Sequence, residues 1–328
     1  MIDVYDARPR RRAVVALGGN ALLRRGEPPE AANQARAAEA AAAALAVAAQ
    51  SHQLIVTHGN GPQVGLLALI SDAYTATAPY PLDVLGSETE GQIGYVLELA
   101  LDNALGDHRV VTLLTRVVVD PGDLAFSAPT KFIGPVYPEA EARALAAQHG
   151  WTVARDGDAW RRVVPSPEPR RIVQRSAIAH LIESGFLVIC TGGGGIPVVE
   201  DATGHQSGIE AVIDKDLASS LLAATLGADV LVLATDVPAV YTDYRSTAQR
   251  AIGHTTPSQL RALRFAGGSM GPKVEAACRF VEHTGGRAAI GDLSDIHELL
   301  DGSTGTQVLP ESGERHDDER SAGHVRAA

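Results

Sequence analysis

Lysine is rare in this chain, and its three copies occupy positions that suit anion binding. Lys and Arg together number 28, but only Lys131, Lys215 and Lys273 are lysines. Lys131 lies in a segment broken by prolines and glycines, whereas the other two stand where helices are expected to begin. Loops and helix N-termini favour anions. Because a lysine ammonium is a compact charge on a flexible stem, this placement suggests a phosphoryl group that moves. Chance placement of three residues is the alternative.

Glycine turns follow several expected strands and are the second signal of an anion site. Bare backbone N–H groups at such turns bind phosphate well. No lysine follows the first turn as in a P-loop, and no turn fits the G-x-G-x-x-G dinucleotide pattern. A single turn can be an ordinary tight connection, but four together favour an extended anionic ligand. The turns contain Gly18 and Gly19, then Gly59, Asn60 and Gly61, then Gly192 to Gly195, and finally Gly267 and Gly268 before Ser269.

Several other polar residues are candidates, each with an ordinary structural explanation. Asp216 could orient a lysine, or could simply be a carboxylate favoured by a helix N-terminus. Asp236 ends a strand, where it could meet ribose or a metal-bound phosphate, or merely form a turn. His58 is expected to be a packed structural histidine. The histidines show no zinc-ligand spacing, and no G-x-S-x-G or Cys–His signature indicates a hydrolase.

The elements that must position these residues alternate between strands and helices. A strand is expected over 13–18, an alanine-rich helix over 29–50, a strand–turn–helix unit over 54–70, and a buried strand followed by a glycine turn over 185–199. Further αβ units follow up to about residue 310. This alternation predicts an α/β fold with a mostly parallel sheet covered on both faces.

Residues 119–170 break this rhythm and are predicted to form an inserted subdomain, plausibly a lid. The segment DPGDLAFSAPTKFIGPVYPE is interrupted by prolines and glycines. A short helix follows it, and two strand-like runs around Asp156 and Gly157 indicate a hairpin. Lys131 would therefore come from the lid.

Composition excludes several classes of function. The net charge of -11 argues against nucleic acid or an anionic membrane as the main partner. Cys190 and Cys278 are far apart in apolar contexts, so we expect buried free thiols. No signal peptide and no apolar span of transmembrane length is expected, which favours a cytoplasmic protein. The termini, 1–12 and 311–328, are expected to be flexible.

These segments together resemble carbamate kinases, within the amino-acid kinase superfamily. The resemblance runs from about Ala13 to Pro310. EAVIDKD and GSMGPKVEA are highly specific in combination, and GGNA with an asparagine points to the carbamate kinases among the superfamily. The matching segments are GGNALL, THGNGPQVG, PTKFIGPVY, RRVVPSPEP, GGGGIPV, EAVIDKD, TDVPAVY and GSMGPKVEAA.

The resemblance implies a three-layer αβα sandwich with an open, mainly parallel sheet and an inserted lid, usually as a homodimer. One domain over 13–310 would hold an acceptor half (13–118 and 171–200), the lid (119–170) and a nucleotide half (201–310). The implied reaction is reversible phosphoryl transfer between ATP and carbamate, giving ADP and carbamoyl phosphate, with Mg2+ held mainly by nucleotide phosphates rather than by protein side chains.

The resemblance also implies a role for each candidate residue. Lys131, Lys215, Asp216 and Asn20 would be catalytic. The acceptor and the transferring group would be cradled by Gly18, Gly19, Gly59, Asn60, Gly61, Gly193 and Gly194. The nucleotide would lie along Asp236, Tyr241, Met270 and Lys273.

Two alternatives stay open. A sister kinase could act on an amino-acid carboxylate, for which the acceptor pocket would need an extra polar or cationic group. A ligand sensor on the same fold would not be an enzyme, but we would expect it to have lost one of the three lysines. Because carbamate is already an oxyanion, the absence of a general-base signature agrees with a carbamate kinase.

Overall fold

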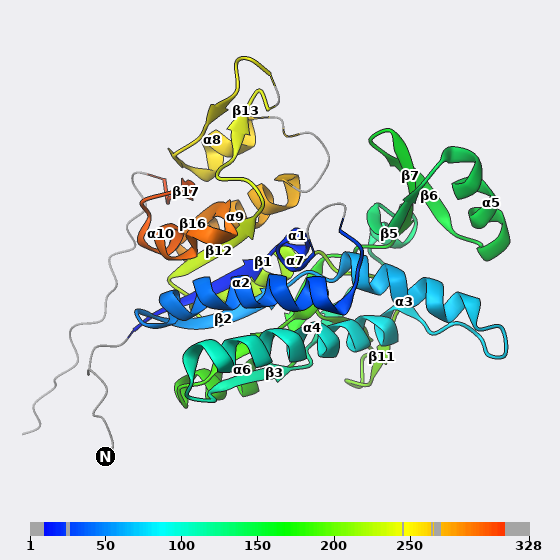
Figure 1. The fold of residues 1–328 in the computed structure, drawn as a ribbon, viewed down its shortest axis with the longest axis horizontal. Helices are drawn as coiled ribbons and strands as arrows, with labels where there is room; N and C mark the ends of the chain where they lie inside the picture. The colour runs from blue at the N-terminus through cyan, green and yellow to red at the C-terminus, as the bar shows by residue number, and fades with distance from the viewer. Residues whose placement is uncertain (1–9, 24–26, 245, 264, 266–269, 312–328) are drawn as a thin grey trace, which may run out of the picture.

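A parallel sheet forms the centre of a computed structural model that describes residues 10–23, 27–244, 246–263, 265 and 270–311. Within these residues eight strands pair in the order β15-β17-β16-β12-β1-β2-β9-β3 (Figure 1). Neighbouring strands are parallel, except that β17 runs antiparallel to β16. The strands are β1 (Arg11–Leu17), β2 (His52–His58), β3 (Val110–Leu113), β9 (Leu187–Cys190), β12 (Val230–Thr235), β15 (His254–Thr255), β16 (Arg287–Asp292) and β17 (Thr306–Val308).

Helices cover both faces of this sheet, because successive side chains of a buried strand point to opposite sides. In β1, Ala13, Val15 and Leu17 pack with α2, α4 and α10, whereas Val14 and Ala16 pack with α6, α7 and α9. The predicted αβα sandwich is thereby confirmed. The covering helices are α2 (Ala31–Ala49), α4 (Leu82–Leu105) and α10 (Ile296–Asp301) on one face, and α6 (Arg175–Glu183), α7 (Lys215–Thr225) and α9 (Met270–Thr284) on the other.

The remaining elements of the body are mostly short. Two short strands, β13 and β14, pair antiparallel with each other. They and the other short elements are α1 (Gly19–Leu22), α3 (Gly61–Ala73), α8 (Pro257–Ala262), β13 (Tyr241–Thr242), β14 (Arg250–Ala251) and the 3-10 turns η1 (Leu124–Phe126), η2 (Gly192–Gly194) and η3 (Leu293–Asp295).

A smaller sheet marks where the predicted lid leaves and rejoins the body. Its order is β11-β10-β4-β8, and β4 and β8 are the strands just before and after the excursion. Here β4 pairs parallel with β10 and antiparallel with β8. The strands are β4 (Arg116–Val119), β8 (Pro169–Ile172), β10 (Ile196–Glu200) and β11 (Gln206–Gly208).

The excursion itself folds into a third sheet, of order β5-β7-β6, with helix α5 against it. Figure 1 shows these elements standing to one side of the body, above α3 in this view. The strands that follow and precede Gly157 pair antiparallel, as the hairpin pattern predicts. The elements are β5 (Lys131–Tyr137), α5 (Glu139–His149), β6 (Thr152–Asp156) and β7 (Ala159–Val164).

Contacts with α3 hold this third sheet close to the body. Gly65 of α3 meets Gly134 of β5 so tightly that a Cβ added at Gly65 would lie 2.0 Å from the Cα of Gly134. Nearby, the His149 Nδ1 atom is 3.9 Å from the Asp72 carboxylate at the other end of α3. The base of the lid sheet therefore rests on α3, backbone against backbone.

The N-terminal end of the fold lies two residues earlier than the sequence predicts. Strand β1 begins at Arg11 rather than at residue 13, so Arg11 and Arg12 are sheet residues and not part of a terminal tail. The alanine-rich helix expected over 29–50 is α2. The rest of the expected tails, 1–9 and 312–328, lies outside the described residues. None of the described helices combines the length and apolar character needed to cross a membrane.

Candidate active site

The first three glycine turns meet at the carboxyl ends of neighbouring strands. They follow β1, β2 and β9, which lie side by side in the sheet. Gly59 N–H donates to the Leu17 carbonyl at 3.1 Å, and a Cβ added at Gly59 would lie 3.1 Å from the backbone nitrogen of Gly19. The expected convergence of these turns on one crevice is therefore what the fold produces.

The third turn closes over the second. Gly193 adopts a φ of +66°, and a Cβ there would lie 2.2 Å from the side-chain nitrogen of Asn60. A Cβ at Gly194 would lie 2.4 Å from the Ile213 carbonyl oxygen, just before α7. Only glycine fits at these two positions, because any side chain would collide with the neighbouring segment.

Two sequence candidates lie wholly or partly outside the described structure. The fourth turn, residues 267 and 268 with Ser269, is not among the described residues. Asn20 lies in helix α1, but its side chain is not described. Gly61, in contrast, is the first residue of α3, and Asn60 is the residue before it, with its amide nitrogen donating to Thr89 Oγ1 at 2.9 Å.

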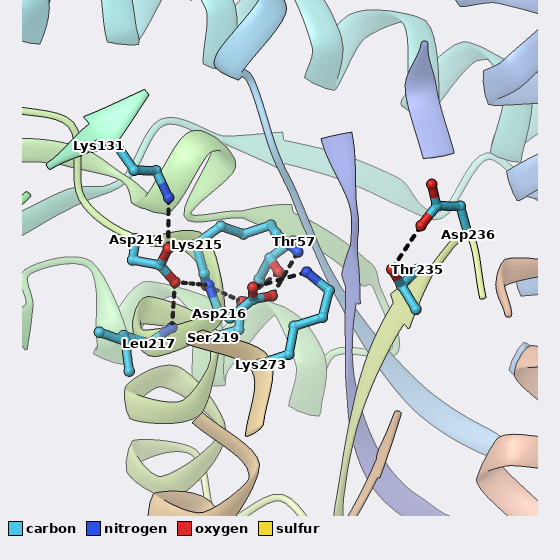
Figure 2. A network of polar contacts seen from close by, with 10 residues as sticks. All are labelled: Thr57, Lys131, Asp214, Lys215, Asp216, Leu217, Ser219, Thr235, Asp236 and Lys273. Atoms are coloured by element: carbon cyan, nitrogen blue, oxygen red, sulfur yellow. Dashed lines mark hydrogen bonds and ion pairs between the residues drawn. The ribbon is translucent and has the colours of Figure 1, made fainter. Parts of the chain in front are cut away.

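Two of the three lysines share one buried aspartate. The Lys215 ammonium lies 2.7 Å from one oxygen of Asp216, and the Lys273 ammonium lies 3.0 Å from the other (Figure 2). Their exposed fractions are 8%, 6% and 4% respectively for Lys215, Lys273 and Asp216. A paired, hydrogen-bonded cluster is the form in which buried charges are tolerated.

Burial and charge pull the pKa values of this cluster in opposite directions. Burial lowers the pKa of Lys215 to about 8, although the charge of Asp216 opposes the shift. Burial also disfavours the charge of Lys273, but the carboxylates of Asp216, Asp214 and Asp236 together outweigh it, so the pKa of Lys273 lies above its ordinary value. For Asp216, burial is overcome by the two ammonium groups, so its pKa lies well below the usual range. An incoming anion would therefore favour the charged form of Lys215.

The third lysine reaches the same place from the β5-β7-β6 sheet, the predicted lid. Lys131, at the start of β5, lies with its Nζ atom 2.5 Å from the Asp214 carboxylate (Figure 2). The other oxygen of Asp214 accepts hydrogen bonds from the backbone of Asp216 and Leu217 and so caps α7. One carboxylate therefore links the lid lysine to the helix that carries Lys215.

The five side chains together carry a surplus of positive charge. Three ammonium groups face two carboxylates, those of Asp214 and Asp216. This imbalance lies beside N–H groups at the ends of β1, β2 and β9. A phosphoryl group would neutralise the surplus and accept those hydrogen bonds.

The candidates on the nucleotide side are less closely joined to the cluster. Asp236 follows β12, is exposed, and lies close enough to Lys273 to raise its pKa. Tyr241 lies in β13, with its ring 6.1 Å from that of Tyr244. Met270 is the first residue of α9, one turn before Lys273. Within the described residues no hydrogen bond or ion pair joins Tyr241 or Met270 to the lysines, so their role stays a prediction.

Sequence reasoning missed three groups that support the site. Asp214 stands next to Lys215 in the sequence, and its value as a helix-capping residue was a signal that could have singled it out. Thr57 Oγ1 bonds Ser219 Oγ at 2.6 Å and so ties β2 to α7. Glu90, in the middle of α4, carries no sequence signal, because a glutamate on an amphipathic helix usually faces water.

Glu90 and His58 are nevertheless fully buried behind the glycine turns. Burial raises the pKa of Glu90 to about 8, even though backbone N–H groups of Thr115 and Gly192 favour its charged form. Burial lowers the pKa of His58 to about 4, so the ring is neutral at pH 7. His58 thus has the packed structural role that the sequence suggests.

Comparisons with known proteins show the family to which the chain belongs. The model of the amino acid kinase family matches residues 11–292. The chain belongs to the amino acid kinase family. It is 51% identical to the carbamate kinase of Haemophilus influenzae, over 90% of this chain and 96% of that protein. It is 53% identical to that of Rhizobium meliloti, over 90% and 93%.

Solved structures of carbamate kinases have the same fold as this chain. A carbamate kinase from Giardia lamblia bound to citric acid superposes with a TM-score of 0.87, at 40% identity, over 92% of this chain and 99% of that one. The same relative is known bound to AMP-PNP, with a TM-score of 0.83 at 39% identity, over 92% and 99%. The resemblance noted from the motifs is therefore confirmed over nearly the whole described chain.

Proposed function

We propose that this protein is a carbamate kinase, which transfers a phosphoryl group reversibly between ATP and carbamate. The observation that carries the proposal is the buried cluster of Lys215, Asp216 and Lys273 beside three converging glycine turns, in a chain about 50% identical to carbamate kinases. A bond forms between a carbamate oxygen and the γ-phosphorus of ATP. The bond from that phosphorus to the bridging oxygen breaks, and ADP leaves.

The acceptor explains why the site contains no obvious base. Carbamate attacks as an oxyanion, so no proton has to be removed, and catalysis consists of positioning and charge neutralisation. The turns containing Gly18, Gly19, Gly59, Asn60, Gly61, Gly193 and Gly194 would supply N–H donors around the transferring group, with Asn20 beside them. Donors fixed in place by the sheet need not reorganise during the reaction.

Each lysine would meet a different part of the charge. Lys215, whose pKa is lowered by burial, would stabilise charge on the transferring phosphoryl group. Lys273 would lie along the nucleotide phosphates with Asp236, Tyr241 and Met270. Lys131 would leave Asp214 and approach the phosphoryl group when the lid closes. Asp216 would orient the two buried lysines without touching substrate.

ADP or ATP with Mg2+ would be the cofactor pair. The described residues contain no group of three or more His, Cys, Asp or Glu side chains arranged to hold a metal. This suits Mg2+, which usually keeps water and substrate phosphates among its ligands and needs only one or two carboxylates. Asp236, exposed and close to Lys273, would lie along the nucleotide, and the ion would be held mainly by the nucleotide phosphates. The bound ion would neutralise charge on the β- and γ-phosphates.

The division into halves and the assembly belong to the same proposal. Residues 13–118 and 171–200 would bind the acceptor, 201–310 the nucleotide, and 119–170 would be the lid. A cytoplasmic homodimer with a role in arginine breakdown fits this assignment. The exposed side chains of Tyr95 and Leu99 on α4, and of Leu114 beyond edge strand β3, offer an apolar surface for a second copy. Sedimentation analysis tests that assembly directly.

The decisive assay is ATP formation by the purified protein from ADP, Mg2+ and carbamoyl phosphate. Acetyl phosphate and glutamyl phosphate serve as rival donors, because a sister kinase acting on another carboxylate would prefer one of them. Rapid ATP formation from carbamoyl phosphate alone is the expected result. Failure with every donor, in folded protein that still binds ADP, would favour the sensor on the same fold.

A further inference from the structure

A buried carboxyl group of α4 joins two chain segments behind the glycine turns. One oxygen of Glu90 accepts the N–H of Gly192 at 2.8 Å, and the other accepts the N–H of Thr115 at 3.1 Å. Glu90 is 1% exposed. A carboxyl group is costly to bury, so two backbone donors that it alone satisfies are a specific arrangement.

Thr115 extends this arrangement to both ends of the third turn. Its hydroxyl oxygen accepts the N–H of Thr191 at 3.1 Å, and its carbonyl oxygen accepts the N–H of Ile196 at 2.8 Å. The turn of residues 192–195, between Thr191 and Ile196, is therefore held by hydrogen bonds to Thr115 and Glu90. A closed network of this kind allows few alternative positions for the turn.

The backbone of the turn is strained and needs such support. Thr191 has a φ of +49°, in the left-handed region that β-branched residues rarely adopt. Strain of this kind persists only where the surroundings fix the conformation. A Cβ added at Gly192 would lie 2.3 Å from His58 Nε2 and 2.9 Å from Glu90 Cγ, so both side chains pack directly on the turn.

The turn of residues 192–195 also fixes the position of Asn60. Gly193 presses against the Asn60 amide, whose nitrogen donates to Thr89, the residue before Glu90 on α4. A shift of the turn would therefore move Asn60 and the N–H groups at the end of β9 together. These are groups that face the acceptor in the proposed reaction.

We propose that Glu90 is a positioning residue for phosphoryl transfer, which holds the turn of residues 192–195 and Asn60 in the geometry that the acceptor requires. This inference rests on the proposed function. Glu90 acts through the turn and does not touch substrate. Both oxygens are needed as acceptors, so an amide in its place would present NH2 to one of the two backbone donors.

The test compares Glu90→Gln with Glu98→Gln. Glu98 is a matched control, because it also lies on α4 and accepts a backbone N–H of the adjacent strand, that of Thr112, at 2.7 Å. Three quantities are measured: kcat/KM for carbamoyl phosphate in ATP formation, the dissociation constant for ADP, and hydrogen exchange of the amides in 187–200.

Glu90→Gln should lower kcat/KM for carbamoyl phosphate by about 10- to 100-fold, as misplaced catalytic groups do. It should speed amide exchange at 192–195 and leave ADP binding unchanged, whereas Glu98→Gln should change none of these. Equal effects of the two variants, or parallel losses of ADP binding and of kcat/KM, would mean that Glu90 is only structural. If Glu90→Gln does not fold, Glu90→Asp, which is too short to serve both donors, replaces it.

The exchange measurement keeps this inference separate from the proposed reaction. If the unmodified protein makes no ATP from carbamoyl phosphate, the proposed function fails, yet the exchange rates still report on the turn. Unchanged exchange at 192–195 in Glu90→Gln would then overturn the role of Glu90 as well.

Discussion

Asp216 binds Lys215 and Lys273 at once, one ammonium group on each carboxylate oxygen, at 2.7 Å and 3.0 Å. The three side chains come from the first turns of α7 and α9 and are almost fully buried. Without the aspartate two like charges would face each other out of reach of water. The position of both lysines therefore depends on a residue that need not touch substrate.

Replacing this aspartate should destabilise the protein strongly. Asp216→Asn keeps the shape but leaves two buried ammonium groups without a counterion, which we expect to cost about 3–5 kcal/mol of unfolding free energy. Urea denaturation followed by circular dichroism measures this loss. Glu200→Gln, which breaks an exposed pair with Arg171, is the control and should leave the unfolding curve close to that of the unmodified protein. A similar, small effect of both variants would show that Asp216 does not hold the lysines.

Exchange of one lysine for arginine should abolish most activity despite the conserved charge. The Lys215 side chain is only 9% exposed and lies against Asp216, so a planar guanidinium has neither the room nor the flexible stem to follow a moving phosphoryl group. Lys215→Arg should lower kcat by about 100-fold or more. Rates of ATP formation measure this, with Arg279→Lys on the exposed face of α9 as control. Near-full activity of Lys215→Arg would refute the argument.

The lid lysine should affect turnover without affecting nucleotide binding. Lys131 contacts Asp214 and lies in the lid sheet, whereas Lys273 and Asp236 come from the body. Lys131→Ala should therefore lower kcat by about 100-fold or more and leave the ADP dissociation constant unchanged in calorimetry. Lys131→Ala also leaves Asp214 without its ion-pair partner. Asp214→Asn, which breaks the same ion pair but keeps the lysine, is therefore the companion variant. Loss of ADP binding in Lys131→Ala would place this lysine at the nucleotide instead.

Activity should decline on the alkaline side as Lys215 loses its proton. Burial holds its pKa at about 8, against the opposing charge of Asp216, and Lys273 lowers it further. The ammonium is present below pH 8 and lost above it, so log kcat/KM should be level and then fall with a slope of about -1. The pKa of Glu90 is also about 8. The same alkaline limb in Glu90→Gln would assign the titration to Lys215, and its disappearance would assign it to Glu90.

Titration of Lys215 should raise the stability of the fold with pH, although it lowers activity. The folded-state pKa of Lys215, about 8, lies below the reference value of 10.5, so the unfolded chain binds more protons between these pH values. The contribution of Lys215 to the unfolding free energy should therefore rise as the pH increases from about 8 to 10.5. The difference in unfolding free energy between the unmodified protein and Lys215→Met, measured at each pH, isolates the contribution of Lys215 from that of other titrating groups. A difference that falls over this range would contradict the lowered pKa.

The sequence by itself determined the α/β class, and it predicted an inserted subdomain and a set of residues suited to phosphoryl transfer. Alternating elements predict a parallel sheet because such strands must be connected by crossovers, and scarce lysines stand out in a chain that otherwise uses arginine. Glycines mark turns where backbone segments touch, and that requirement is local enough to be read from residue type. These are properties of short segments, so no tertiary structure was needed.

The tertiary structure alone decided which of these residues meet and what holds them. Lys131 and Asp214 are 83 positions apart, and Lys273 and Asp216 are 57 apart, so no local pattern predicts either pair. Glu90 resembles any polar residue on a helix, and only the packing of α4 behind β9 buries it under the turn of residues 192–195. Burial sets its pKa and that of Lys215, and burial is a property of the whole fold. Residue types therefore indicate the chemistry of the site, but packing determines its geometry and the protonation of its charged groups.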